Sequence, residues 1–563
     1  MTPSLRSGGQ ILVDQLKIHG ADLAFCVPGE SYLPVLDALH THRDRIKLIT
    51  CRHESGAANM ADAYGKMTGK PGLCFVTRGP GATNASIGVH TAFQDSTPMI
   101  LFIGQVGSDF VEREAFQEID YRRMFGQMAK WVAQIDRADR LPEFIARAYQ
   151  VATAGRMGPV VLALPEDMLS SIVAVADAKP WQRIGISPGE PALARLSTML
   201  QNAERPLVIA GGTGWDGASC ADLQQFIETQ QLPVGCAFRY QDVFDNDHAQ
   251  YAGDVGIGIN PALAARIKAA DLLIAIGPRL GEMTTGGYDL IHAPVPAMKL
   301  VHIHAGAEEL GRVYQADLMI NATMPEMARA LALLPRLTQA GIESHARDAN
   351  TDYQAWQGRK ETPGNVQMWE VMQELERVLP KNAILSNGAG NYATWLHRFH
   401  RYHARAGFRT QLAPTSGAMG YGVPAAIAAK AMHPERVAIA FAGDGCFLMT
   451  GQELATAMHH QLNVIIIVVN NNMYGTIRMH QEREFPGSVH GTSLTNPDFA
   501  AYARSFGAHG EVVENTAEFA AAFARARNAG KPALIEIRID AEAISPNTTL
   551  QAIRDDAVLG KAR

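Results

Sequence analysis

The sequence has few of the features that mark a membrane-bound or secreted protein. Its longest apolar runs, such as "VIIIVV" at 464–469, are far too short to cross a bilayer. The N-terminus lacks the basic stretch, long apolar core and small-residue cleavage site of a signal peptide. Six cysteines, at 26, 51, 74, 220, 236 and 446, are scattered without paired spacing, which argues against a zinc site or a disulfide framework. We therefore expect a protein of the reducing cytoplasm with no membrane partner.

The chain also has no large excess of positive or negative charge. The formal net charge of -6 gives no general attraction for nucleic acid, so no nucleic-acid partner is expected. Hydrophobic residues make up 47% and charged residues 19% of the chain, which is typical of a well-packed globular protein. At 563 residues the chain is too long for one core and suggests about three domains.

Short β-branched apolar runs alternate with helical patterns along the whole chain, which predicts parallel sheets with crossover helices. Strands are expected in three groups: 23–27, 46–51, 72–77 and 98–104; 206–212, 232–236, 271–277 and 299–304; and 382–387, 437–443, 463–470 and 533–539. Polar stretches at 176–191 and 341–365 have the composition of linkers. The sequence predicts an α/β protein of three doubly wound parallel-sheet domains, at 1–175, 190–338 and 362–545, followed by a tail at 546–563.

The apolar run at 437–443 ends on Asp444, which lies between two glycines. An Asp-Gly pair can be an ordinary turn. However, a helix with a capping box of Thr450 and Glu453 follows, and the next strand ends at Asn470 and Asn471. A right-handed crossover brings both strand ends to one edge of the sheet, so Asp444 and Asn471 are expected to be neighbours. A carboxylate and an amide oxygen there suit Mg²⁺, and the glycines let backbone N–H groups approach a phosphate.

This gapped pattern resembles the diphosphate–Mg²⁺ motif of thiamine diphosphate (ThDP) enzymes. The resemblance implies that Asp444, Asn471 and the backbone carbonyl of Met473 bind the metal. Met419 matches the apolar residue that props the cofactor into its bent shape, and Cys446 stands where a serine is usual. The cofactor contacts implied by the resemblance are Gly390, Asn391, Met419, Gly443, Gly445, Cys446, Met473 and Tyr474.

A second half-site is expected within 48–84. Glu54 follows a strand and opens a helix, a position that also favours glutamate for the helix alone. The stretch, with "RHE" and "GPGATN", resembles the first domain of acetolactate synthases, and this resemblance extends over nearly the whole chain. It implies that Glu54 is catalytic, hydrogen-bonding N1′ of the aminopyrimidine of ThDP. Gln117, in "AFQE", falls on the glutamine that lines the reacting centre, and Phe116 packs beside it as a substrate contact. The three domains would be the pyrimidine-binding, central and diphosphate-binding domains of that family.

Acetolactate synthases also hold FAD, and here the resemblance weakens. Arg156 and the glycines of "AGGTG" are retained, but the family's "RFDDRVTG" reads "PRLGEMTTG" at 278–286. "HIDID" likewise reads "HIHAG" at 302–306, so acidic groups that would hold a ribose are lost. His302 and His304 share one strand face, an arrangement more typical of core histidines than of a metal site. The sequence leaves open whether FAD, or the ADP part of coenzyme A, binds the central domain.

The substrate side departs from the family too. Glu166 stands where the family has a lysine, and His480 stands where it has an acceptor-selecting tryptophan. Arg478, two places before His480, is either a partner for a substrate carboxylate or a solvated arginine. "EAISPNTTLQAIR" at 542–554 resembles the C-terminal segment that closes over the site.

The resemblance implies a ThDP- and Mg²⁺-dependent enzyme that decarboxylates a 2-keto acid such as pyruvate and ligates the acyl group to a second carbonyl. The alternatives are a 2-hydroxyacyl-CoA lyase or oxalyl-CoA decarboxylase, a simple 2-keto acid decarboxylase, and a cofactor-binding protein without turnover. Retention of Glu54 argues against the last, because a mere binder needs no proton relay. The family builds its site between two chains, which predicts a homodimer or homotetramer. The donor, the acceptor, the product stereochemistry and any regulatory subunit stay open.

Overall fold

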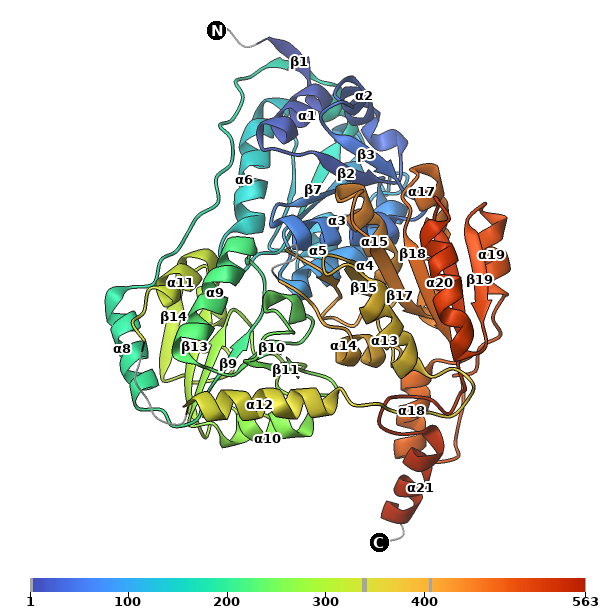
Figure 1. The fold of residues 1–563 in the computed structure, drawn as a ribbon. Coiled ribbons are helices and arrows are strands. Elements are labelled where there is room, and N and C mark those ends of the chain that lie inside the picture. Colours follow the sequence, from blue (N-terminus) through green and yellow to red (C-terminus); the bar gives the residue numbers. More distant parts are fainter. Residues whose placement is uncertain (1–3, 337–341, 405–407, 562–563) are drawn as a thin grey trace. The chain divides into compact units, whose positions relative to one another are not determined.

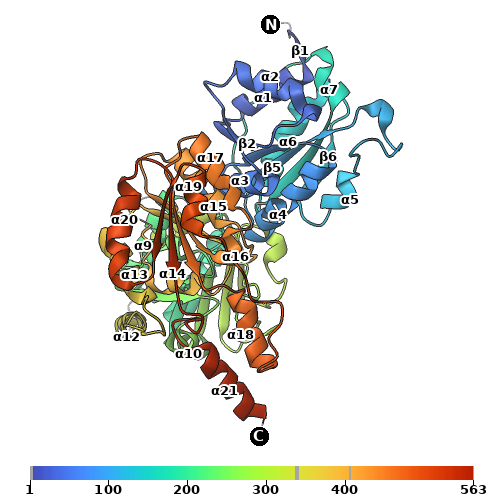
Figure 2. The same ribbon diagram turned by 90° about the vertical axis from the view of Figure 1, so that its right-hand side faces the viewer.

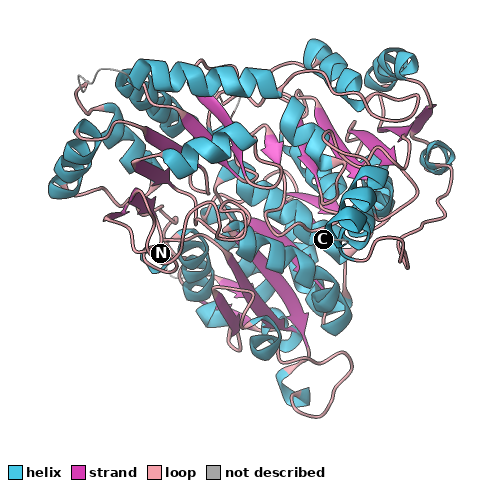
Figure 3. Cartoon of the chain, turned by 90° about the horizontal axis from the view of Figure 1, so that it is seen from below, coloured by secondary structure: helices cyan, strands magenta, loops and turns pink. Residues whose placement is uncertain are grey.

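The computed structural model describes residues 4–336, 342–404 and 408–561. The chain divides into two compact units, Met1–Ile184 and Gly185–Arg563. Within the described residues, the first unit holds one six-stranded parallel sheet and the second unit holds two. Helices cover the strands of each sheet (Figure 3). The α/β class with three doubly wound sheets is thus confirmed, while the domain boundaries stay predictions.

The first unit is a parallel sheet with helices on both faces. Its strands run, in spatial order, β3 (Lys47–Thr50), β2 (Leu23–Cys26), β4 (Gly72–Val76), β5 (Met99–Gln105), β7 (Pro159–Pro165) and β6 (Trp131–Gln134). One face packs against α1 (Gly8–Ile18), α2 (Leu33–Thr41) and α6 (Leu141–Thr153). The other packs against α3 (Glu54–Thr68) and α4 (Gly79–Asp95) (Figure 1). The short elements are α5 (Tyr121–Phe125), α7 (Glu166–Ser170) and an antiparallel pair, β1 (Leu5–Ser7) with β8 (Ile172–Ala174).

The central sheet has the strand order β11 (Tyr251–Val255), β10 (Val234–Ala237), β9 (Pro206–Ala210), β12 (Leu272–Ile276), β13 (Lys299–His304) and β14 (Leu318–Asn321). Helices α8 (Glu190–Gln201), α9 (Gly217–Gln230) and α11 (Met324–Ala332) share one apolar core with the sheet. Helices α10 (Pro261–Ala269) and α12 (Ile342–Trp356) cover the opposite face (Figure 1).

The prediction of a polar linker over 341–365 was wrong, because most of that stretch is α12. Ala346, Ala349 and Tyr353 are buried and spaced three and four residues apart, which gives the helix an apolar stripe. That stripe packs near β11 and α10. By contrast, the predicted linker at 176–191 has no regular element before α8 begins at Glu190.

The last sheet has the order β16 (Gln411–Leu412), β15 (Ile384–Asn387), β17 (Ala438–Gly443), β18 (Ile465–Asn470), β20 (Ala533–Arg538) and β19 (His509–Val513). Figure 2 shows α13 (Met368–Val378), α14 (Ala393–Phe399) and α20 (Phe519–Asn528) on one side of it. On the other side are α15 (Gly422–Met432) and α19 (Phe499–Ser505). The remaining helices are α16 (Asp444–Phe447), α17 (Leu454–His459), α18 (Gly475–Glu484) and α21 (Leu550–Lys561).

The capping box predicted at Thr450 and Glu453 is absent. A 3-10 turn, Gly451–Glu453, precedes α17, and no side chain caps it. The Thr450 hydroxyl donates to the Gly420 carbonyl at 2.6 Å, and Glu453 accepts from the Thr456 hydroxyl at 2.6 Å. The prediction failed because the Thr450 hydroxyl is bonded to Gly420, far from the helix in sequence, and not to a backbone N–H group of the helix start.

All six cysteines lie in the described part of the chain; each is buried, and none of them forms a disulfide bond there. Among the described helices, none combines the length and apolar character that a bilayer span requires.

Candidate cofactor and active site

The ends of β17 and β18 meet at the carboxyl edge of the last sheet, where Gly443 pairs with Val469. Asp444 follows directly and is only 3% exposed. Its carboxylate faces the backbone N–H groups of Gly445, Asn472 and Met473. Burial raises the pKa of Asp444, and these nearby N–H groups offset only part of that rise. The structure therefore brings Asp444 together with the segment that follows β18, as the crossover predicts.

Asn496 also belongs to this cluster, although the sequence did not indicate it. Its Nδ2 donates to Oδ2 of Asp444 at 2.8 Å and lies 3.1 Å from Oδ1 of Asn470. Its own Oδ1 is buried and has no hydrogen-bond partner among the described residues. Asn496 is 52 positions from Asp444, so no local spacing could reveal it. A buried carboxylate beside an unsatisfied amide oxygen fits a hard cation such as Mg²⁺.

Asn471, the other predicted metal ligand, is half-buried and lies beside Gly475 at the start of α18. Its Nδ2 is 3.1 Å from the place that a Cβ on Gly475 would take. Met473 is buried, and its backbone N–H lies near the Asp444 carboxylate. Metal binding by these two residues stays a prediction.

Glycine is needed at positions near this cluster because aromatic rings fill the space that a Cβ would take. A Cβ on Gly443 would lie 2.8 Å from the ring of Tyr392, and one on Gly445 would lie 2.6 Å from the ring of Tyr474. Gly390 has φ +140, a conformation that L side chains rarely adopt. Packing against the two tyrosine rings, and the backbone conformation at Gly390, therefore require glycine at these three positions.

The thiol of Cys446 is engaged in the fold. It accepts a hydrogen bond from the Gly420 N–H at 3.2 Å and lies 3.2 Å from the Tyr392 hydroxyl. That hydroxyl also accepts from the Gly388 N–H at 3.1 Å, and burial together with the thiol raises the pKa of Tyr392. Any cofactor contact at Cys446 would therefore come from its backbone.

Two further predicted cofactor residues lie on loops that reach this edge. Asn391 accepts from the Thr476 hydroxyl at 2.9 Å, and its Nδ2 lies 3.4 Å from the sulfur of Met479. These contacts fasten the 390–391 loop to α18. Met419 is half-buried and packs against the core of the last sheet.

The predicted substrate residues on α18 differ in their surroundings. Arg478 donates through Nε to the Thr492 hydroxyl at 2.8 Å and through Nη2 to the Ser493 hydroxyl at 3.0 Å. One edge of its guanidinium is thus already engaged by neutral groups. His480 is exposed. Substrate binding by either residue stays a prediction.

The C-terminal segment docks onto α18. Glu482 is fully buried and forms a two-bond ion pair with Arg554, with Oε1–Nη2 at 2.6 Å and Oε2–Nε at 2.9 Å. The guanidinium lowers the pKa of Glu482. A small apolar cluster completes the contact, formed by Met473, Ile544, Leu550 and Ile553 with Met479 beside them. The tail thus touches Met473, one of the predicted metal ligands.

In the first unit, Glu54 is the first residue of α3, which His53 caps through its bond from the Ser55 N–H. The Asn84 side chain donates to Oε2 of Glu54 at 3.0 Å. Gln117 has a left-handed backbone, φ +66, and its carbonyl accepts from the Gly79 N–H at 3.0 Å. The first two turns of α4 therefore contact both predicted catalytic residues, Gln117 through Gly79 and Glu54 through Asn84. Phe116, beside Gln117, is 71% exposed.

The central sheet reverses its strand order between β9 and β12, the place where sheets of this order bind dinucleotides. Trp215 is buried there and donates to the Gly211 carbonyl at 2.8 Å. Asp216 caps the N-terminus of α9 by accepting from the Ser219 N–H at 2.8 Å. Trp215 therefore lies at the point where the strand order reverses, and Asp216 occupies the N-terminus of α9.

The two histidines of β13 are buried at the same edge. His302 lies with Nε2 3.0 Å from the Pro278 carbonyl, and His304 accepts at Nδ1 from the Gly306 N–H at 2.9 Å. Burial lowers the pKa of His302, and it lowers the pKa of His304 to about 4. Both imidazoles are therefore neutral at pH 7 and bonded to backbone.

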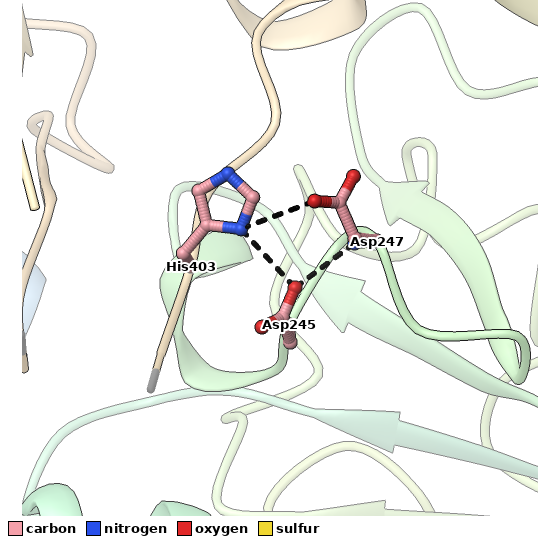
Figure 4. A group of neighbouring side chains, drawn as sticks. All are labelled: Asp245, Asp247 and His403. Atoms are coloured by element: carbon pink, nitrogen blue, oxygen red, sulfur yellow. Dashed lines mark hydrogen bonds and ion pairs between the residues drawn. The ribbon is translucent and has the colours of Figure 1, made fainter. Parts of the chain in front are cut away.

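A cluster of Asp245, Asp247 and His403 has the composition of a metal site (Figure 4). Nδ1 of His403 lies 3.2 Å from Oδ1 of Asp245 and 3.7 Å from Oδ2 of Asp247. Asp247 also pairs with Lys381 at 2.9 Å and with Arg401 at 3.1 Å. These cations already balance the carboxylates, so the cluster fastens the central sheet to the segment after α14 rather than offering free ligands.

Comparison with known proteins gives the class. Three family descriptions match the chain in order: "Thiamine pyrophosphate enzyme, N-terminal TPP binding domain" at residues 6–124, the central domain at 193–331 and the C-terminal TPP binding domain at 388–537. The chain belongs to the thiamine diphosphate (thiamine pyrophosphate) enzyme family, and it is an enzyme of the carboligase and decarboxylase type.

Within that family the chain is similar to acetolactate synthase large subunits. It is 30% identical to the isozyme 2 large subunit of Escherichia coli, covering 95% of this chain and 96% of that protein. It is 32% identical to the large subunit of Parasynechococcus marenigrum, covering 95% and 88%. The large subunit of Corynebacterium glutamicum is 29% identical, covering 96% and 88%.

Proposed function

We propose that the protein uses ThDP and Mg²⁺ to decarboxylate a 2-keto acid such as pyruvate and to ligate the acyl group to a second carbonyl. One observation carries the proposal: a single chain keeps both the buried Asp444 cluster and the Glu54 half-site. The relatives named above are acetolactate synthases, which supports this reaction class.

Asp444 would be the main anchor of the metal, with Asn471 and the carbonyl of Met473 as further ligands. No salt bridge reaches Asp444 in the described part of the chain, so its buried charge lacks a cationic partner. A divalent cation would supply that partner and would bridge to a diphosphate, as Mg²⁺ does in proteins. Asn496 is proposed as a further metal ligand, because its buried Oδ1 has no hydrogen-bond partner among the described residues.

ThDP, when bound, supplies a nucleophilic thiazolium carbon and an electron sink. Glu54 would hold a proton between one carboxyl oxygen and N1′ of the pyrimidine ring. Asn84 already fixes Oε2 of Glu54, and Oε1 lies 3.4 Å from the place of a Cβ on Gly81. The Asn84 bond therefore sets part of the orientation of the carboxyl group before the cofactor arrives. Gln117 would orient the substrate, and Phe116, Arg478 and His480 would shape its pocket.

The central sheet edge does not fit FAD. In sheets of this order a dinucleotide diphosphate lies at the N-terminus of the first helix, but here the carboxylate of Asp216 occupies that end of α9. The acids expected to hold a ribose are replaced by His304, which is bonded to backbone. The same features disfavour the ADP part of coenzyme A. The purified protein should show no flavin absorption and no thermal shift with FAD, ADP or coenzyme A; stoichiometric flavin would contradict this.

We further propose a homodimer or homotetramer, because the family completes each site with the first domain of one chain and the last domain of another. Light scattering of the active protein tests this proposal, and an active monomer would contradict it.

The reaction is tested by incubating the protein with ThDP, Mg²⁺ and pyruvate and identifying the products by NMR. Acetolactate or acetoin, formed by the wild type and not by Glu54→Gln, is the expected result. Product formed equally by Glu54→Gln would contradict the role of Glu54. Absence of any product would remove pyruvate as the donor and turn the test toward bulkier 2-keto acids.

A further inference from the structure

Arg78 is a buried cation at an unusual place in the first unit. It lies two residues after the end of β4 and is the N-cap residue of α4, although its side chain makes no capping bond. The guanidinium side chain is only 9% exposed. Its Nη2 pairs with Oε2 of Glu166 at 2.8 Å, and Nη1 lies 3.8 Å from Oε1 of Glu30. Nε is buried and has no hydrogen-bond partner within the described part of the chain.

A positive charge is disfavoured at a helix N-terminus, because the helix dipole is positive there. Burial adds to the cost, since a charge taken out of water needs a partner. Glu166 is the first residue of α7, directly after β7, and Glu30 comes shortly after β2. Arg78 therefore ties together the carboxyl ends of three strands of the sheet: β2, β4 and β7.

The first two turns of α4, which begin directly after Arg78, contact both predicted catalytic residues. Gly79 donates its N–H to the Gln117 carbonyl, and a Cβ on Gly79 would lie 2.9 Å from that oxygen. One turn later, Asn84 donates to Glu54. A shift of the start of α4 would move both contacts at once, because they lie on the same short, continuous stretch of helix.

We propose that Arg78 and Glu166 are positioning residues that hold the first turn of α4, and through it Glu54 and Gln117, in place for cofactor activation. Glu166, which replaces a family lysine on the expected substrate side, thereby acts on Arg78 rather than on the substrate. The inference rests on the proposed function, because it assumes that Glu54 activates ThDP.

The test measures hydrogen–deuterium exchange at C2 of the thiazolium ring of ThDP bound to the full protein, by acid quench and NMR. No substrate is needed, so the result does not depend on knowing the donor. Arg78→Met should slow the exchange roughly 10- to 100-fold at saturating ThDP, since a small misplacement of a catalytic group has effects of that size. Glu166→Gln, which keeps the shape and removes the charge, should slow it about tenfold.

The double variant should be no slower than Arg78→Met alone, because Glu166 has nothing to hold once the guanidinium is gone. Arg78→Lys should restore part of the rate when Glu166 is present and none in Glu166→Gln. The matched control is Asp167→Asn, since Asp167 neighbours Glu166 but bonds to the Ser108 N–H at 3.1 Å. It should stay within about twofold of the wild type.

ThDP affinity and thermal stability are measured beside each rate, and slower exchange at unchanged affinity supports positioning. Exchange within twofold of the wild type in both single variants, or effects that multiply in the double variant, would overturn the inference. Wild-type exchange no faster than that of free ThDP would overturn the proposed function itself, and the two failures are thus distinguishable.

Discussion

Replacing His304 with asparagine tests whether the imidazole of His304, at the end of β13, is buried and neutral in the folded protein. The pKa of His304 is lowered from 6.5 to about 4, and burial is the main cause. The unfolded chain therefore binds a proton at a higher pH than the folded chain, so stability is full above pH 6.5 and falls as the pH drops toward 4. At about 1.36 kcal/mol per pKa unit, the loss is about 2 kcal/mol at pH 5 and about 3 kcal/mol near pH 4.

His304→Asn keeps an oxygen that can accept the Gly306 N–H and removes the titration. Denaturant unfolding at pH 7.5 and pH 5 measures the difference in the free energy of unfolding. The wild type should lose about 2 kcal/mol more than His304→Asn between these values. The exposed His459 provides the control, and His459→Asn should keep the wild-type pH dependence. An identical acid loss in the wild type and His304→Asn would refute the claim that His304 is buried and neutral.

Three other predictions follow from the same structure. Asp444→Asn should abolish Mg²⁺-dependent ThDP binding in calorimetry yet raise the stability of the cofactor-free protein. The reason is that burial raises the pKa of Asp444, so the wild type loses stability as the pH rises from about 4 through that raised value. Arg554→Met leaves Glu482 buried without its cationic partner, so the free energy that docks α21 onto α18 should fall by about 3 kcal/mol. Helix α21 should then become the first site of limited proteolysis. The pKa of Glu482 is lowered, so acid below that pKa should release the tail of the wild type in the same way. Asp245→Asn should destabilise the second unit by about 1–3 kcal/mol, whereas a chelator should leave its melting temperature unchanged, because the partner of Asp245 is His403 and not a metal ion.

Interior strands could be predicted from the sequence because they are buried on both faces and form continuous apolar runs. The strands that were not predicted are the edge strands β6, β11, β14, β16 and β19, the short antiparallel pair β1 and β8, and the interior strand β7. In the edge strands β6 and β19 most residues are only half-buried, so these strands form no continuous apolar run. Helix α12 was not predicted because its narrow stripe of buried residues, Ala346, Ala349 and Tyr353, lies within a mostly polar stretch.

The candidate site was predictable where the residues follow strand ends in sequence. Asp444 and the segment after β18 could be paired because a crossover fixes their relation. Asn496 could not, because it comes from a distant loop that only tertiary folding brings to the carboxylate. The partner of Glu166 could not be predicted either, since Arg78 lies 88 positions away on another strand end.

The most direct test of the central claim is the rate of CO₂ release from pyruvate at saturating ThDP and Mg²⁺, measured for the wild type and for Glu54→Gln in parallel. We expect turnover by the wild type that requires both ThDP and Mg²⁺, and a loss of roughly 100-fold or more in Glu54→Gln while ThDP still binds. Equal rates for the two proteins, or turnover by the wild type without ThDP, would contradict the account.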